Sequence, residues 1–257
     1  NASSSSFLGQ KTSHHLECFL LEKEPFLNNP NLKKMVKSFQ LLFTKWGLTY
    51  ELVEYHDRAN GNSLTHEFYF NHPSGDRTII FCPACGYKSN QNYAQSSNPK
   101  TSEVNFLPLE EVYTPDTKTI DDLSKFLEID PSQTAKAVFL MATIPDGGGI
   151  KEEVVLAIVR GDMELDEQKL ARAIQAYQLR PANEAEILSI GAIPGFASPV
   201  GLKNGFIVID DLIPQANNLV AGANKKDFHL KNVNFERDYR ADLIADISLV
   251  NPGYYCP

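Results

Sequence analysis

The sequence predicts a mixed α/β fold: a smaller α+β segment followed by a larger domain with a mixed sheet and surrounding helices. Three observations predict it. The first part combines one amphipathic helical pattern with short apolar runs, the second alternates apolar runs with helical patterns, and a stretch rich in Ser, Asn and Gln at 89–103 separates them. We expect a first segment at 1–105, a main domain at 106–247 and a C-terminal return segment at 248–257.

The first segment opens with a predicted helix over residues 31–46, which Gly47 ends. Its apolar residues recur at helical spacing: Met35, Phe39, Leu42, Phe43 and Trp46. Residues 48–53 predict a strand. Residues 67–70 and 78–82 are expected to pair as antiparallel strands across the turn residues 72–76.

The main domain begins with a helix that Thr119 caps and that ends at Leu127, followed by a helical turn at Asp130-Pro131. Apolar runs at 137–142 and 154–159 predict a buried hairpin across the glycines at 147–149. Residues 167–177 and 183–190 predict two helices, and residues 206–209 predict a further strand.

Composition limits the class of protein. With 42% hydrophobic residues among 257, the chain can bury a sizeable core. The net charge of −8 argues against a protein that coats nucleic acid indiscriminately, since Lys and Arg supply most non-specific affinity. No apolar run approaches the roughly 20 residues that cross a bilayer, and the first residues lack the pattern of a secretory signal. We therefore expect a cytoplasmic protein that does not bind membranes.

The cysteines are few, which fits a reducing compartment. Cys82-Pro-Ala-Cys85 has the spacing of half a zinc knuckle, and Cys256 could begin a second half. The alternative, that these are structural or relict thiols, is favoured over bound zinc.

Five segments of the main domain occur in the order of a known hydrolytic module: TIDDLSKFLEIDPSQTAKAVFLM, LAIVRGDMELDEQKL, GAIPGFASPVGL, VIDDLIPQANNLVAGANKKDFHL and NFERDYRADLIADI. Together they resemble the editing insertion of bacterial-type prolyl-tRNA synthetases and its free-standing deacylase relatives. The pieces LLFTKWGLTYELVEYHD, ANGNSLTHEF and FCPACGYKSNQNYA resemble the part of the synthetase catalytic domain that precedes the insertion. The arginine motifs that hold ATP in class II synthetases are absent from these 257 residues, so we expect no adenylate formation by them.

The resemblance implies four catalytic candidates: Lys136 near a strand start, Gly195 in the GxxxP loop, Asp210 at a strand end, and His229. In that scheme Lys136 holds phosphate or ribose oxygens, the Gly195 loop holds the carbonyl, Asp210 receives the substrate ammonium and His229 positions substrate or water. The residues alone leave bland alternatives open, namely a solvated lysine, a capping carboxylate and a packed histidine.

Further candidates for substrate binding follow from the same motifs: Phe196, Ala197, Ser198, Pro199, Gly222 and Asn224. Ser198 has no neighbouring base in the sequence, so we expect a serine of a surface turn rather than a nucleophile. Gly222 and Asn224 are expected to shape a tight turn.

The resemblance implies hydrolysis of mischarged aminoacyl-tRNA, with alanyl-tRNA(Pro) as the expected substrate and no cofactor or metal required. Because a missing methylene changes binding by only about 1–3 kcal/mol, a separate small pocket removes what a synthetic pocket cannot reject. Two alternatives stay open: a piece of an ATP-dependent proline-tRNA ligase, and a non-catalytic paralogue that binds tRNA or a synthetase. The expected partner is the acceptor end of tRNA(Pro). Association with a prolyl-tRNA synthetase, a homodimer and the role of residues 1–105 stay open.

Overall fold

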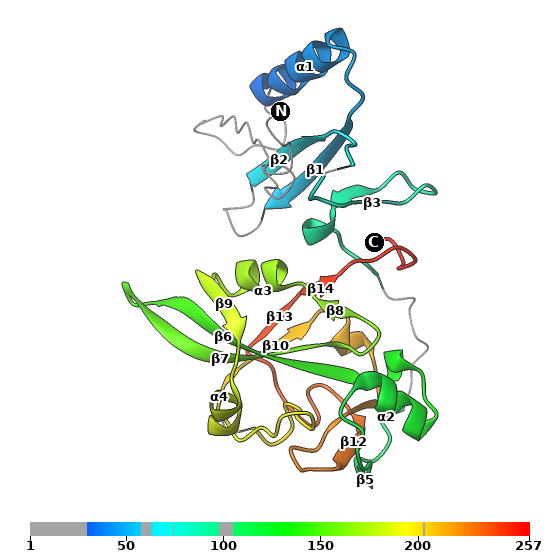
Figure 1. Ribbon diagram of the computed structural model, residues 1–257, viewed down its shortest axis with the longest axis vertical. Helices are drawn as coiled ribbons and strands as arrows, with labels where there is room; N and C mark the ends of the chain where they lie inside the picture. The colour runs from blue at the N-terminus through cyan, green and yellow to red at the C-terminus, as the bar shows by residue number, and fades with distance from the viewer. Residues whose placement is uncertain (1–29, 58–62, 74, 98–104, 203) are drawn as a thin grey trace, which may run out of the picture. The chain divides into compact units, whose positions relative to one another are not determined.

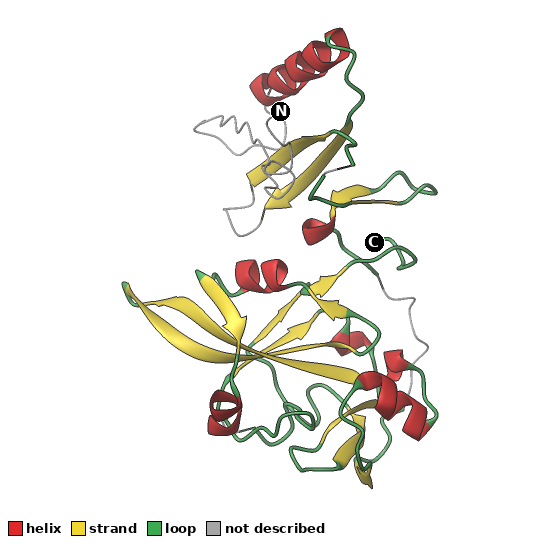
Figure 2. Cartoon of the chain, viewed as in Figure 1, coloured by secondary structure: helices red, strands yellow, loops and turns green. Residues whose placement is uncertain are grey.

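The computed structural model describes residues 30–57, 63–73, 75–97, 105–202 and 204–257, so Cys18 and residues 98–103 of the predicted linker lie outside the described residues. The prediction of a linker from residue 89 is wrong for residues 89–93, which form the end of a strand and a 3-10 turn. The chain forms two compact units, Asn1–Ala94 and Gln95–Pro257. The division falls earlier in the chain than the predicted boundary between residues 105 and 106. Figures 1 and 2 show the helices and strands of each unit.

The first unit contains α1 (Pro30–Lys45), β1 (Glu51–Asp57), β2 (Ser63–Tyr69), β3 (Ile79–Phe81), β4 (Lys88–Asn90) and the 3-10 turn η2 (Gln91–Tyr93). The helix ends where predicted, because Gly47 adopts a left-handed φ of 68°. Its apolar side packs on β2, with the rings of Phe43 and Phe68 5.1 Å apart. Aromatic contacts therefore hold this small unit together.

The predicted strand pairing in the first unit is wrong. β2 pairs with β1, and β3 pairs with β4, both antiparallel. The turn Cys82-Pro-Ala-Cys-Gly86 explains the second hairpin: Gly86 has a φ of 79° and donates its N–H to the Cys82 carbonyl at 2.9 Å. The predicted cysteine motif is therefore also a hairpin turn.

A five-stranded mixed sheet forms the centre of the second unit, in the order β13-β10-β7-β6-β9. Its long hairpin, β6 (Ala135–Asp146) with β7 (Gly149–Arg160), extends the predicted one in both directions. β10 (Phe206–Asp210) runs parallel to β7 and to β13 (Leu243–Ala245), and β9 (Gln178–Pro181) pairs antiparallel with β6.

A second sheet is antiparallel and has the order β11-β12-β5, from β11 (Leu219–Gly222), β12 (Phe228–Val233) and β5 (Glu110–Tyr113). β8 (Glu164–Leu165) pairs with β14 (Ser248–Leu249). The helical elements are α2 (Ile120–Leu127), η3 (Pro131–Gln133), α3 (Glu167–Ala173), α4 (Glu184–Ser189) and η4 (Ile213–Gln215).

The predicted helices form, and their caps explain their limits. Thr119 accepts the N–H of Asp122 at the start of α2, and Asn183 forms a capping box with Glu186 in α4. α3 ends before Tyr177, the predicted end, because Gln175 is left-handed, with a φ of 56°, and the Ala176 N–H bonds to the Ala171 carbonyl.

The central strand β7 is buried on both faces, which explains its continuous apolar sequence. Val155, Ala157 and Val159 pack in the cluster that contains Leu170 of α3. Leu156 and Ile158 pack in the cluster that contains residues of β11 and β12. Figure 1 shows α3 and β12 on opposite sides of the β6–β7 hairpin. The five-stranded sheet therefore has an α3 face and a β12 face.

Candidate functional site

The GxxxP loop, residues 195–199, lies between α4 and β10. Gly195 is exposed and has a φ of 82°, a backbone conformation that residues other than glycine rarely adopt. The next residue turns inward: Phe196 is only 2% exposed, and its N–H bonds to the Ile193 carbonyl at 3.0 Å. The loop thus presents backbone at Gly195 and is anchored in the core by Phe196.

Asn224 fixes the loop from the segment that follows β11. Its backbone N–H donates to the Phe196 carbonyl at 2.8 Å. Its side-chain Oδ1 accepts the Ser198 N–H at 3.2 Å, while Nδ2 donates to the carbonyls of Ser198 and Val200, both at 2.9 Å. Asn224 itself is left-handed, with a φ of 49°, which asparagine tolerates better than most residues. Asn224 therefore positions the loop.

Gly222 lets β11 approach the loop closely. A Cβ atom at Gly222 would lie 2.2 Å from both the carbonyl carbon and the oxygen of Phe196, so no side chain fits there. Ser198 is also part of this packing, since it is 1% exposed and its Oγ accepts the Val200 N–H at 3.3 Å. The expectation that Ser198 is a surface serine is wrong, because the Asn224 contacts draw the loop against β11.

His229 lies on β12, opposite Gly222 of β11. Its imidazole is 5% exposed and packs edge-on against the Phe196 ring, with centroids 5.7 Å apart. The Nδ1 atom lies 2.7 Å from the Thr114 Oγ1. Burial lowers the pKa of His229 to about 4, because the apolar surroundings disfavour the imidazolium. The ring is therefore neutral at neutral pH.

Thr114 belongs to the site, although no motif in the sequence indicates it. It follows β5, is fully buried, and donates its N–H to the Asp227 carbonyl at 2.9 Å. Its own carbonyl accepts the Thr117 hydroxyl at 2.8 Å. A threonine before a proline looks like an ordinary turn residue, so no local signal points to its contact with a histidine far along the chain.

The residues Thr114, Gly195–Pro199, Gly222, Asn224 and His229 form what we call the loop site. Within the described part of the chain, no hydrogen bond occupies the backbone N–H groups of Gly195 and Ala197. His229 Nε2 likewise has no hydrogen-bond partner among the described residues. This nitrogen atom is not fully buried. The loop site thus combines a rigid loop, two available backbone donors and a neutral imidazole.

Lys136 and Asp210 lie outside the loop site. Alternation along β6 places Lys136 on the same face as Val138 and Leu140, which is the α3 face. The ammonium of Lys136 is paired with the carboxylate of Glu164, at β8. The structure therefore does not bring the four catalytic candidates into one group: Gly195 and His229 lie together, and Lys136 and Asp210 border the β8–β14 pair.

Asp210 is fully buried, and its carboxylate accepts three backbone N–H groups: Leu212 at 3.1 Å, Ile247 at 3.0 Å and Ser248 at 2.9 Å. These contacts tie the end of β10 to the segment that enters β14. They support a structural role, since three of the roughly four acceptor sites of this buried carboxylate are already filled. The predicted substrate contact of Asp210 stays a prediction.

Two more carboxylates and a lysine surround Asp210. The pKa of Asp211 is raised to about 6, because the Asp211 carboxyl group is partly buried and lies near the charges of Asp210 and Asp246. Burial also raises the pKa of Asp246, against the opposing effect of Lys169. The Lys169 side chain, 3% exposed, donates to Asp246 at 2.7 Å and to the Ser248 carbonyl at 2.8 Å. One buried cation thus balances this acidic group.

A family model matches most of the second unit. Residues 114–239 match the family model of the aminoacyl-tRNA editing domain, a range that contains the whole loop site. This part of the chain is an aminoacyl-tRNA editing domain.

The relatives of the editing domain include whole synthetases. The chain is 41% identical over 223 residues to the proline–tRNA ligase of Dehalococcoides mccartyi, covering 87% of this chain and 38% of the ligase. It is 38% identical over 221 residues to the proline–tRNA ligase of Salinispora tropica, covering 86% of this chain and 37% of the ligase. The chain thus spans less than two fifths of the length of these curated relatives, and the resemblance to the editing region of prolyl-tRNA synthetases is confirmed.

Among solved structures, the chain is similar to a protein described as "a putative trans-editing enzyme for prolyl tRNA synthetase". The identity is 20% and the TM-score is 0.40, with 49% of this chain and 76% of that chain covered. No helix in the part of the chain that the structure describes is long and apolar enough to cross a membrane.

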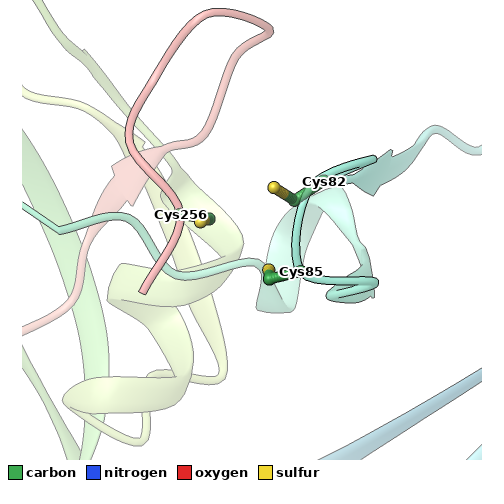
Figure 3. A group of neighbouring side chains, drawn as sticks. All are labelled: Cys82, Cys85 and Cys256. Carbon is green, nitrogen blue, oxygen red and sulfur yellow. The ribbon is translucent and has the colours of Figure 1, made fainter.

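The three cysteines with zinc-like spacing divide between the two units. Figure 3 shows Cys82 and Cys85 at the turn that joins β3 and β4 of the first unit. Cys256 belongs to the second unit, which contains the editing domain. The interpretation that the sequence favours, structural or relict thiols rather than bound zinc, stays a prediction.

Proposed function

We propose that the editing domain hydrolyses the ester of mischarged aminoacyl-tRNA, with alanyl-tRNA(Pro) as its substrate and prolyl-tRNA(Pro) spared. The observation that carries the proposal is the way in which Asn224, Gly222 and Phe196 hold the GxxxP loop beside His229. A fixed loop of this kind suits acyl transfer, where catalysis depends on donors placed in advance around a developing oxyanion.

In the proposed reaction, water attacks the ester carbonyl carbon, and the bond from that carbon to the ribose oxygen breaks. The ribose oxygen takes one proton of the water, and the amino acid leaves as a carboxylate after the other proton passes to solvent. The unoccupied N–H groups of Gly195 and Ala197 are the donors that we assign to the oxyanion. A ribose hydroxyl of the terminal adenosine orients the water, as the family resemblance implies.

We assign His229 a positioning role rather than the role of a general acid or base. Its lowered pKa keeps the ring neutral, and the Thr114 contact fixes Nδ1, which leaves Nε2 for the substrate or for water. A general base that shuttles a proton near neutral pH would need a pKa closer to 7. Phe196, Ser198, Pro199, Gly222 and Asn224 then act by holding the loop.

Lys136 remains a candidate for the phosphate or ribose oxygens of the substrate. Its ammonium would have to exchange the exposed carboxylate of Glu164 for the substrate, which is a small change because exposed ion pairs are weak, about 0–1 kcal/mol. Asp210 differs from Lys136, because its buried carboxylate already accepts three backbone N–H groups, which supports a structural role.

The test is deacylation of labelled alanyl-tRNA(Pro) and prolyl-tRNA(Pro) without ATP. We expect release of alanine, retention of proline, and loss of activity in Asn224→Ala. Lys136→Ala tests the separate prediction for Lys136, with Lys151→Ala as its matched control, because Lys151 forms a comparable exposed pair with Glu153. If the wild-type protein cleaves neither ester faster than buffer, the hydrolase proposal fails.

The identity to proline–tRNA ligases along 87% of the chain favours one second candidate, a part of an ATP-dependent proline-tRNA ligase. The first unit carries the resemblance to a catalytic domain. Proline attachment that requires ATP, measured on a longer polypeptide containing these residues, would support it. Editing by the second unit is compatible with that outcome, whereas tRNA binding without hydrolysis would support the non-catalytic alternative.

A further inference from the structure

Lys118 lies against the exposed backbone of the GxxxP loop. A Cβ atom at Gly195 would lie 3.4 Å from Cγ of Lys118 and 3.6 Å from its Cβ and Cδ. The aliphatic stem of the lysine therefore crosses the glycine that the loop presents to solvent. Any group that binds at Gly195 lies beside this side chain.

The turn that carries Lys118 is well fixed. Thr117 is buried and donates its hydroxyl to the Thr114 carbonyl, and Thr119 caps α2. Thr114, at the start of the same turn, is the residue that contacts His229. Lys118 and Thr114, which contacts His229, thus belong to one short segment beside the loop site.

The ammonium of Lys118 is available for a ligand. The residue is exposed, and within the described part of the chain it makes no hydrogen bond or ion pair. Two other lysines of the editing domain differ: Lys136 is paired with Glu164, and Lys225 with Glu111. In a chain with a net charge of −8, an unpaired cation over the proposed ester site favours an anionic ligand at that place.

We propose that Lys118 binds a backbone phosphate of the single-stranded 3′ end of tRNA, beside the ester held at Gly195. The proposal rests on the proposed function for the identity of the ligand. A lysine ammonium is a mobile point charge that suits a phosphate whose exact position varies, and its stem seals one side of the loop. Lys118 is then a binding residue that supplies affinity rather than chemistry.

The experiment measures binding of two fluorescent acceptor-stem helices of tRNA(Pro), one with and one without the unpaired 3′ nucleotides. Lys118→Met keeps the stem over Gly195 and removes the charge, and Lys118→Arg keeps the charge. Lys125→Met is the matched control, since Lys125 is an exposed lysine in the last turn of α2. We expect Lys118→Met to weaken binding of the complete helix about ten-fold and to reduce the salt dependence by about one phosphate contact.

The helix that lacks the 3′ nucleotides should bind the wild-type protein, Lys118→Met and Lys125→Met alike. The proposal is overturned if Lys118→Met binds the complete helix as tightly as the wild type does, if Lys125→Met loses as much affinity, or if wild type does not distinguish the two helices. Deacylation by wild type is measured separately. If binding depends on Lys118 but the wild type does not hydrolyse the ester, the proposed function is rejected and this inference is kept. If the wild type hydrolyses the ester but binding does not depend on Lys118, this inference is rejected and the proposed function is kept.

Discussion

The side chain of Asn224 holds both backbone polar groups of Ser198, accepting its N–H at 3.2 Å and donating to its carbonyl at 2.9 Å. This reciprocal pair replaces the hydrogen bonds that a neighbouring strand would provide, so the backbone polar groups of Ser198 are satisfied although the loop is irregular. The loop that presents Gly195 therefore depends on a residue that lies beyond it in the sequence, after β11.

Asn224→Ala should disable the loop while leaving the fold in place. It removes three side-chain hydrogen bonds and leaves the Ser198 and Val200 carbonyls without this donor, so we expect a loss of stability of about 2–3 kcal/mol. A displaced loop should lower kcat about 100-fold. Deacylation kinetics and urea unfolding measure the two effects.

Asn232→Ala is the matched control for this variant. Asn232 is also a left-handed asparagine, with a φ of 63°, and its Nδ2 donates to the Pro108 carbonyl. It should lose some stability with no change in kcat. Equal kinetic losses in the two variants would show that Asn224 acts through general stability alone.

Gly222→Ala should be far more damaging than an alanine at a glycine with open surroundings. The new methyl group would lie 2.2 Å from the Phe196 carbonyl, and neither backbone segment can yield without breaking β11 or the loop. We expect a loss of at least about 3 kcal/mol, at the upper end for single substitutions. Urea unfolding measures it.

Gly201→Ala provides the comparison. Gly201 has a φ of 77° and nothing within 4 Å of its Cβ position, so only backbone strain of about 1 kcal/mol opposes an alanine there. If Gly222→Ala were as stable as Gly201→Ala, the close packing of β11 on the loop would be wrong.

Much of the fold could be predicted from local pattern. The β6–β7 hairpin followed from two apolar runs and three glycines, and α2 and α4 followed from their caps. The pairing in the first unit failed because strand partners are chosen by turns and packing, and the Cys82–Gly86 turn was not recognised as one. Local signals place elements but do not select their partners.

The candidate site was predicted less completely than the fold. Gly195, Gly222 and His229 do come together, because β11 and β12 pair directly beside the loop. Lys136 and Asp210 do not join them, since alternation along β6 and β10 turns both toward the α3 face. Which face a strand residue takes depends on the register of the whole sheet, and one sequence carries no direct sign of it.

The neutral state of His229 gives a pH dependence of stability. Its pKa is about 4 in the folded protein and about 6.5 in the unfolded chain, so the unfolded state takes up a proton first as the pH falls. The stabilising effect of the neutral ring is fully present above pH 6.5 and is lost as the pH falls from there to 4. NMR titration of the imidazole measures the folded pKa directly.

The comparison with His229→Gln isolates this effect in unfolding experiments. The difference in stability between wild type and variant should shrink on acidification from pH 6.5 to 4. The pH profile of deacylation by the wild type should contain no inflection near pH 6.5 that is caused by His229. Any inflection there should therefore also be present in His229→Gln. An imidazole pKa close to 6.5 would contradict the buried, neutral ring.

Lys169→Met tests the charge balance around Asp210. The substitution leaves the carboxylates of Asp246, Asp211 and Asp210 without their buried cation, and breaking a buried pair in this way should cost about 3 kcal/mol at pH 7. Lys151→Met is the control, because its pair with Glu153 is largely exposed and should contribute less than about 1 kcal/mol.

Acidification should partly rescue the Lys169→Met protein. The pKa of Asp211 is raised in the folded state to about 6, so the folded protein binds this proton more tightly than the unfolded chain does. That contribution to stability is present at low pH and is lost as the pH rises from about 4 to 6. Because the charge of Lys169 lowers the pKa of Asp211, its removal should extend this pH range upward. Unfolding measured at pH 5 and pH 7 should therefore show a smaller difference between wild type and Lys169→Met at pH 5. A difference that stays constant would mean that Lys169 stabilises β14 through the Ser248 carbonyl rather than through the carboxylates.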